Sequence, residues 1–105
     1  MRNGLFLAAL LLSLSASAQT APAPEPVVIQ SFAFGPQAVT VRAGTKVTWV
    51  NKDIEPHTVV SNDHKFQSEA LDTNESFSVT FDKAGSYGYF CTLHPHMTGT
   101  VTVTP

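Results

Sequence analysis

The 105-residue sequence has one cysteine, Cys91, so no disulfide can form within the chain. Charge is also sparse: 13% of residues are charged, and six Lys and Arg against eight Asp and Glu give a formal net charge of −2. This is too few positive charges for a nucleic-acid-binding surface, and we exclude such partners. A glycine-rich phosphate loop is absent as well, which argues against nucleotide binding.

Long apolar runs are confined to the first 18 residues. Arg2, the apolar run Leu5–Leu14 and the small residues Ala16–Ala18 predict a secretory signal peptide over residues 1–18. The run is shorter than the ~20 residues a membrane-spanning helix needs, so we expect no membrane span in the mature chain. Removing 18 of 105 residues leaves 87, enough for one small domain. Loss of Arg2 makes the net charge one unit more negative, and export predicts a periplasmic location.

The remaining chain contains no window with helical periodicity. Residues 19–26 form a Pro- and Ala-rich leader, and residues 27–105 form the predicted domain. In that domain, short runs rich in Val, Thr and aromatic residues alternate in hydrophobicity and end at turn residues, which is typical of a β-sandwich. The expected strands are 27–34, 38–42, 46–51, 58–61, 76–81, 87–91 and 100–104. We predict an all-β, antiparallel domain of two facing sheets, with Lys65–Asp72 ambiguous between strand, helical turn and loop.

Tyr87 follows a turn that contains Gly85, which resembles the tyrosine corner of Greek-key sandwiches. An immunoglobulin-type domain is the nearest rival fold. Such domains usually join their sheets through two cysteines, and only Cys91 is present here. A lone cysteine in an exported chain is exposed to oxidation unless it is buried or used.

The residues that carry chemistry cluster near that cysteine. Cys91, His94 and Met97 lie within seven residues, and His57 lies 34 residues earlier, between two other expected strands. A thiolate, two imidazoles and a weak axial thioether form the ligand set of blue-copper electron-transfer sites. Thiolate and thioether suit Cu(I), while imidazole nitrogen suits Cu(II), so this set tolerates both oxidation states with little rearrangement.

Three other functions use the same residues. An exported copper carrier or chaperone without electron transfer is the main alternative, and a pale Cu(II) complex would favour it. An enzyme with Cys91 as nucleophile and His94 as base leaves Met97 and His57 without a role, so we expect no enzyme. Structural zinc is disfavoured because methionine is a poor zinc ligand.

His94 is a better candidate ligand than His96. His96 is adjacent to Met97, and two consecutive residues do not readily converge on one ion, whereas His94 has two residues between it and either sulfur ligand. We therefore expect His96 to be an exposed loop residue, as is His64. Trp49 is expected in the core.

The domain resembles the small bacterial cupredoxins of the amicyanin and plastocyanin type. The similar segments are VTWVN at 47–51, PH at 56–57, AGSYGYFC at 84–91 and CTLHPHM at 91–97. The resemblance implies an eight-stranded Greek-key sandwich, one type 1 copper ion and one-electron shuttling between periplasmic redox proteins, by a chain we expect to be monomeric. By position, it implies the ligands His57, Cys91, His94 and Met97.

The resemblance also assigns residues around the ligands. Asn51 and Thr58 are expected to support the site, Thr58 standing where many relatives have asparagine. The partner-binding patch and electron exit are expected at Leu93, His94, Pro95 and His96. Where amicyanins have an aromatic residue, this chain has His96, a group whose charge can change near neutral pH.

Overall fold

The computed structural model describes residues 23–105, and within this range it contains strands but no helix. The strands are β1 (Val27–Gln30), β2 (Ala33–Gly35), β3 (Ala38–Arg42), β4 (Thr45–Asn51), β5 (Val60–Ser61), β6 (Ser76–Phe81), β7 (Gly85–Phe90) and β8 (Thr98–Thr104). The predicted signal peptide and the first part of the leader lie outside the described residues. No helix in the described part of the chain is long and apolar enough to cross a membrane.

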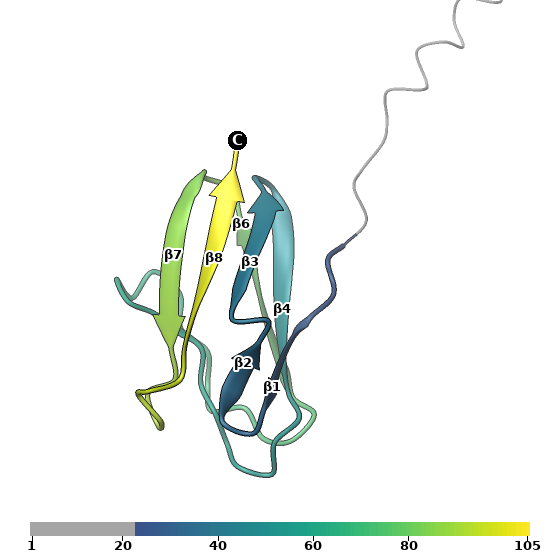
Figure 1. Cartoon of the computed structure of the whole chain (residues 1–105), viewed down its shortest axis with the longest axis vertical. Coiled ribbons are helices and arrows are strands. Elements are labelled where there is room, and N and C mark those ends of the chain that lie inside the picture. Colours follow the sequence, from purple (N-terminus) through teal and green to yellow (C-terminus); the bar gives the residue numbers. More distant parts are fainter. Residues whose placement is uncertain (1–22) are drawn as a thin grey trace, which may run out of the picture.

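The strands form two four-stranded sheets, in the orders β2-β1-β4-β6 and β3-β8-β7-β5 (Figure 1). This confirms the predicted sandwich of two sheets. The prediction of a purely antiparallel domain is wrong, because β1 pairs with β4 and β3 with β8 in parallel. Alternating hydrophobicity reports which face of a strand is buried and carries no information about the direction of the neighbouring strand.

The first expected strand, 27–34, is in fact a hairpin. Ser31 and Phe32 separate β1 from β2 and have left-handed backbone angles, with φ of 53° and 58°. Two-residue hairpin turns of this kind usually contain Asn and Gly, which tolerate positive φ. Neither residue is present here, so the local sequence gave no indication of the turn.

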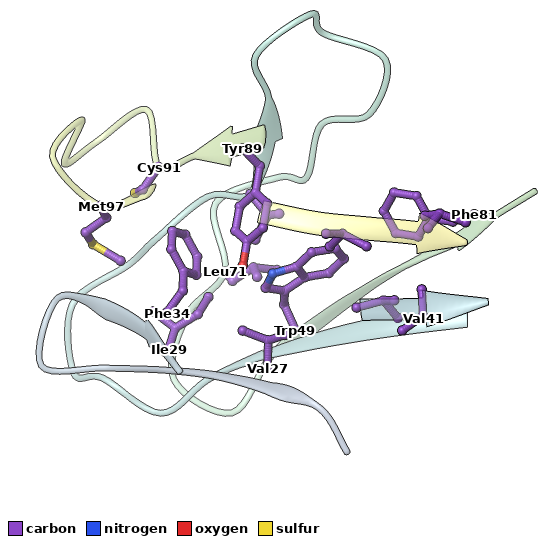
Figure 2. Close-up of a cluster of buried hydrophobic side chains, with 14 residues drawn as sticks. Val27, Ile29, Phe34, Val41, Trp49, Leu71, Phe81, Tyr89, Cys91 and Met97 are labelled. Carbon is purple, nitrogen blue, oxygen red and sulfur yellow. The ribbon is translucent and has the colours of Figure 1, made fainter. Parts of the chain in front are cut away.

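The core lies between the sheets and is centred on Trp49 from β4 and Tyr89 from β7. Their rings meet edge to face, with centroids 5.2 Å apart, and Phe34 contacts Tyr89 in the same way. Figure 2 shows Cys91 and Met97 at one end of this cluster and Phe81 near the other. The expected burial of Trp49 is confirmed. The candidate ligands Cys91 and Met97 lie at one end of the aromatic core.

The corner between β6 and β7 is tied by Tyr87, whose hydroxyl donates to the carbonyl of Lys83 at 2.7 Å. The expected tyrosine corner is therefore confirmed.

The ambiguous segment Lys65–Asp72 is irregular, and isolated bridges through Gln67 and Leu71 fasten it to the chain around β5. The end of β7, the β1–β2 turn and the loop after β4 all lie at one end of the sandwich, the lower end in Figure 1.

Candidate metal centre

Three side chains from two distant segments meet at that end of the sandwich. His57 Nδ1 lies 3.7 Å from Cys91 Sγ, and His94 Nδ1 lies 3.8 Å from it. One donor atom from each residue lies within 4.8 Å of the other two. His57 and Cys91 are fully buried, whereas His94 is partly exposed. Both imidazoles therefore present the same ring nitrogen toward one buried sulfur.

The loop from Cys91 to Met97 is held by its own backbone. The N–H of Cys91 donates to the carbonyl of Met97 at 3.1 Å, and the N–H of Met97 donates to the carbonyl of His94 at 2.9 Å. Cys91 directly follows β7 and faces inward like Tyr89, as the alternation along the strand predicts. Met97 is buried and lies beside Cys91 in Figure 2. The loop thus brings a second sulfur to the same place.

His57 is held in place by backbone hydrogen bonds to the segment that contains Leu71. Its N–H and carbonyl exchange hydrogen bonds with Leu71, at 3.1 and 2.7 Å. Asn51, fully buried at the end of β4, donates from its side-chain amide to the carbonyls of Glu55 and Leu71, each at 2.8 Å. Asn51 therefore holds the backbone before His57, at Glu55, and the backbone that pairs with His57, at Leu71. Its side chain makes no hydrogen bond to His57, Cys91 or His94 within the described chain.

Thr58 joins the two segments of the cluster. Its backbone N–H donates to Cys91 Sγ at 3.3 Å. Its side-chain Oγ1 accepts from the N–H of Thr92 and pairs with the Thr92 hydroxyl, both at 2.8 Å. A threonine at this position thus supplies a direct link from the His57 segment to the Cys91 loop.

Two residues at the centre were not identified from the sequence. The Asp53 carboxylate lies 2.8 Å from His57 Nε2, on the side of the ring away from Cys91. The ring of Phe32, half exposed, meets His57 and His94 edge-on, at centroid distances of 5.5 and 4.9 Å. The four-residue spacing between Asp53 and His57 was visible in the sequence, but such a spacing is too common to single out, and Phe32 had been placed within a strand.

The residues expected in the partner patch lie on the surface beside the cluster. Leu93, Pro95 and His96 are exposed, and His94 is partly exposed. His96 lines a shallow hollow next to Met97 and does not belong to the three-residue donor cluster. His64, also exposed, lies in the turn after β5.

The donor set fits copper. A buried thiol, two imidazole nitrogens directed toward it and an adjacent buried thioether match the His2Cys arrangement with a methionine, which copper(II) and copper(I) both accept. The side chains of His57, Cys91, His94 and Met97 are thus arranged as a type 1 copper site. The N–H of Thr58 also donates a hydrogen bond to Cys91 Sγ, at 3.3 Å.

Comparison with known proteins agrees with this geometry. A family model described as a cupredoxin-like domain matches residues 4–103. Amicyanin of Paracoccus versutus is 38% identical over 93 residues, covering 83% of this chain and 70% of that protein. Plastocyanin of Scenedesmus fuscus is 43% identical over 83 residues, covering 67% of this chain and 85% of that protein.

A solved structure of an amicyanin variant in its Cu(I) form is also similar. It superposes with a TM-score of 0.72 at 32% sequence identity, covering 82% of this chain and 87% of that one. The family match spans nearly the whole sequence, and the amicyanin structure, which has the same fold, is that of a Cu(I) form. The chain therefore belongs to the cupredoxin-like domain family.

Proposed function

We propose that this chain is an exported one-electron carrier with a single type 1 copper ion held by His57, Cys91, His94 and Met97. The observation that carries the proposal is the convergence of two imidazole Nδ1 atoms on the buried Cys91 sulfur, at 3.7 and 3.8 Å. Copper bound there supplies a Cu(II)/Cu(I) couple. The similarity to amicyanin and plastocyanin supports the same assignment.

The protein's part is to hold the donor groups still. Backbone hydrogen bonds fix His57 against Leu71 and close the loop from Cys91 to Met97. Thr58 then joins the two segments. Donors anchored in this way change position little between oxidation states, which suits rapid electron transfer and is not needed for simple metal storage.

Electrons would leave through His94, since its ring extends from the buried sulfur toward the surface. Leu93, 49% exposed, lies next to it in the loop. Together with Pro95 and His96, these residues would form the surface that meets a donor or acceptor protein. Phe32, whose ring contacts His94, extends this apolar surface onto the β1–β2 turn.

The spectrum of the copper-loaded chain tests the proposal. We expect an intense visible thiolate-to-copper absorption and rapid, reversible voltammetry. A Cu(II) complex that forms but stays pale would instead support the exported copper carrier or chaperone. Export to the periplasm is tested separately, by the N-terminal sequence of the protein recovered from that compartment, which we expect to begin at Gln19.

Replacing Leu93 with alanine tests the partner surface. The side chain is exposed and is not a ligand, so the variant should keep its visible absorption while electron exchange with a redox partner slows by several-fold. Stopped-flow measurement of the bimolecular rate checks this. Unchanged partner kinetics would place the docking surface elsewhere.

A further inference from the structure

Asp53 makes a contact that fixes which nitrogen of His57 carries the proton. Its Oδ2 lies 2.8 Å from His57 Nε2, with His57 fully buried and the Asp53 side chain 13% exposed. An ionised carboxylate can only accept a hydrogen bond. The proton of a neutral His57 ring therefore sits on Nε2, which leaves the lone pair of Nδ1 directed toward Cys91 Sγ.

The carboxylate is itself held by the β1–β2 turn. The N–H of Ser31 donates to Oδ1 and the N–H of Phe32 donates to Oδ2, both at 3.0 Å. The left-handed conformation of these two residues directs both N–H groups to the same side. The Phe32 N–H is the main reason that the pKa of Asp53 lies below its ordinary value, and His57 and Ser31 act in the same direction. Asp53 is therefore ionised at neutral pH.

The backbone of Asp53 is fastened as well. Its N–H donates to Asn51 Oδ1 at 2.9 Å, and its carbonyl accepts from the Thr73 hydroxyl at 2.6 Å. Asp53 is thus connected to the end of β4, to the segment before β6 and to the β1–β2 turn, and it directs its one remaining interaction at His57. This is more anchoring than an ordinary loop carboxylate receives.

We propose that Asp53 is a positioning residue for the copper centre, selecting the Nε2–H tautomer of His57 and lowering the reduction potential through its negative charge. The inference rests on the copper-carrier function proposed above. A carboxylate that accepts from a metal-binding imidazole fixes the orientation of the ring and makes its other nitrogen a stronger donor. Stronger nitrogen donation and a nearby negative charge both favour Cu(II) over Cu(I). The same residue connects the turn that carries Phe32 to the site.

Two substitutions separate charge from geometry. In Asp53→Asn the amide oxygen can still accept from His57 Nε2, so the negative charge is lost while this hydrogen bond is retained. In Asp53→Ala both are lost. Asp82→Asn is the matched control, because it removes the same charge at a distance from the site. Asp82 is exposed and precedes the first residue of β7, whereas Cys91 follows the last residue of that strand.

The first measurement is the reduction potential of each copper-loaded variant. We expect Asp53→Asn to lower the ratio of Cu(II) to Cu(I) affinity about tenfold, a rise of about 59 mV for a one-electron couple. Asp82→Asn should change the ratio by less than twofold. Equal shifts in the two variants would overturn the inference, because a remote carboxylate would then have the same effect as Asp53. No shift in Asp53→Asn would overturn it as well.

The second measurement is solvent exchange of the His57 Nε2–H in the reduced protein, followed by nuclear magnetic resonance. Exchange should be slow in the wild type and Asp53→Asn, and at least tenfold faster in Asp53→Ala. If neither variant folds, the wild type alone decides, since rapid exchange of this proton would exclude the hydrogen bond.

The wild type also separates this inference from the copper-carrier proposal. If the chain proves unable to form a blue copper centre, the metal-free protein still reports the tautomer of His57. A proton on Nε2 supports the role of Asp53 in orienting the ring, and a proton on Nδ1 overturns it.

Discussion

Replacing Thr58 with valine removes the side-chain link between the two halves of the centre. Valine has the same shape but replaces Oγ1 with a methyl group. The hydrogen bonds lost are those from the Thr92 N–H and with the Thr92 hydroxyl, both at 2.8 Å, and a longer contact of 3.8 Å from the Thr58 hydroxyl to Cys91 Sγ. The backbone N–H of residue 58 still donates to Cys91 Sγ at 3.3 Å, so the shorter of the two contacts to the sulfur survives.

The size of the effect follows from the burial of the two partners. Each hydrogen bond contributes about 0.5–1.5 kcal/mol net, and an unsatisfied buried group costs more. Thr58 is 7% exposed, but Thr92 is exposed, so water can satisfy part of what is lost. We therefore expect a loss of about 2 kcal/mol in unfolding free energy. For a domain of this size, that corresponds to a fall of about 8–16 °C in Tm.

Denaturant unfolding of the metal-free protein measures this loss, with Thr102→Val as the control. Thr102 is exposed on β8, and its hydroxyl makes no hydrogen bond to the rest of the described chain. The control should lie within about 0.5 kcal/mol of the wild type. If Thr58→Val is no less stable than Thr102→Val, Thr58 does not brace the loop. Copper-loaded Thr58→Val should keep its visible absorption band.

Two further predictions concern the core. Gly99→Ala should cost about 1–3 kcal/mol in unfolding free energy, because a Cβ there would overlap the buried ring of Tyr89. The same substitution should cost less in a Tyr89→Leu background, where the ring is absent. An equal cost in both backgrounds, or a stable single variant, would refute the clash. Burial raises the pKa of Tyr89 above its ordinary value of 10.0, so the unfolded chain loses this proton first and stability falls as the pH rises above 10. Relative to Tyr89→Phe, the wild type should lose up to about 1.4 kcal/mol per pH unit in that range, as measured by denaturant unfolding between pH 9 and 11.5; parallel pH profiles of the two proteins would contradict this.

Most of the strands could be predicted because their sequences satisfy local rules. Residues 38–42 and 76–81 coincide with β3 and β6, because alternation and β-branched residues within each strand agree with the turn residues that flank it. The hairpin at Ser31 and Phe32 could not be predicted, because its stabilising partner is remote. The turn residues donate to Asp53, more than 20 positions away, and no local pattern reports that acceptor.

The candidate ligands were visible for a different reason. Cysteine, histidine and methionine are few in this chain, and their side chains carry metal chemistry wherever they stand. Spacing alone was enough to gather Cys91, His94 and Met97 on one loop. The approach of His57 depends on the exchange of hydrogen bonds with Leu71, and only the folded chain displays it.

The residues missed by sequence reasoning, Asp53 and Phe32, have roles that depend on what they touch. An aspartate in a loop is ordinarily solvated, and a phenylalanine in an apolar run is ordinarily core. Here the Asp53 carboxylate faces the buried imidazole of His57, and the Phe32 ring meets the imidazoles of His57 and His94 edge-on. The ligands can therefore be identified from residue type and spacing, whereas the properties of the bound metal depend on contacts that only the folded chain shows. Changing a ligand should abolish the copper centre, whereas changing Asp53 should leave it present but shift its potential. A chain in which Asp53→Asn destroyed the visible absorption outright would contradict that division.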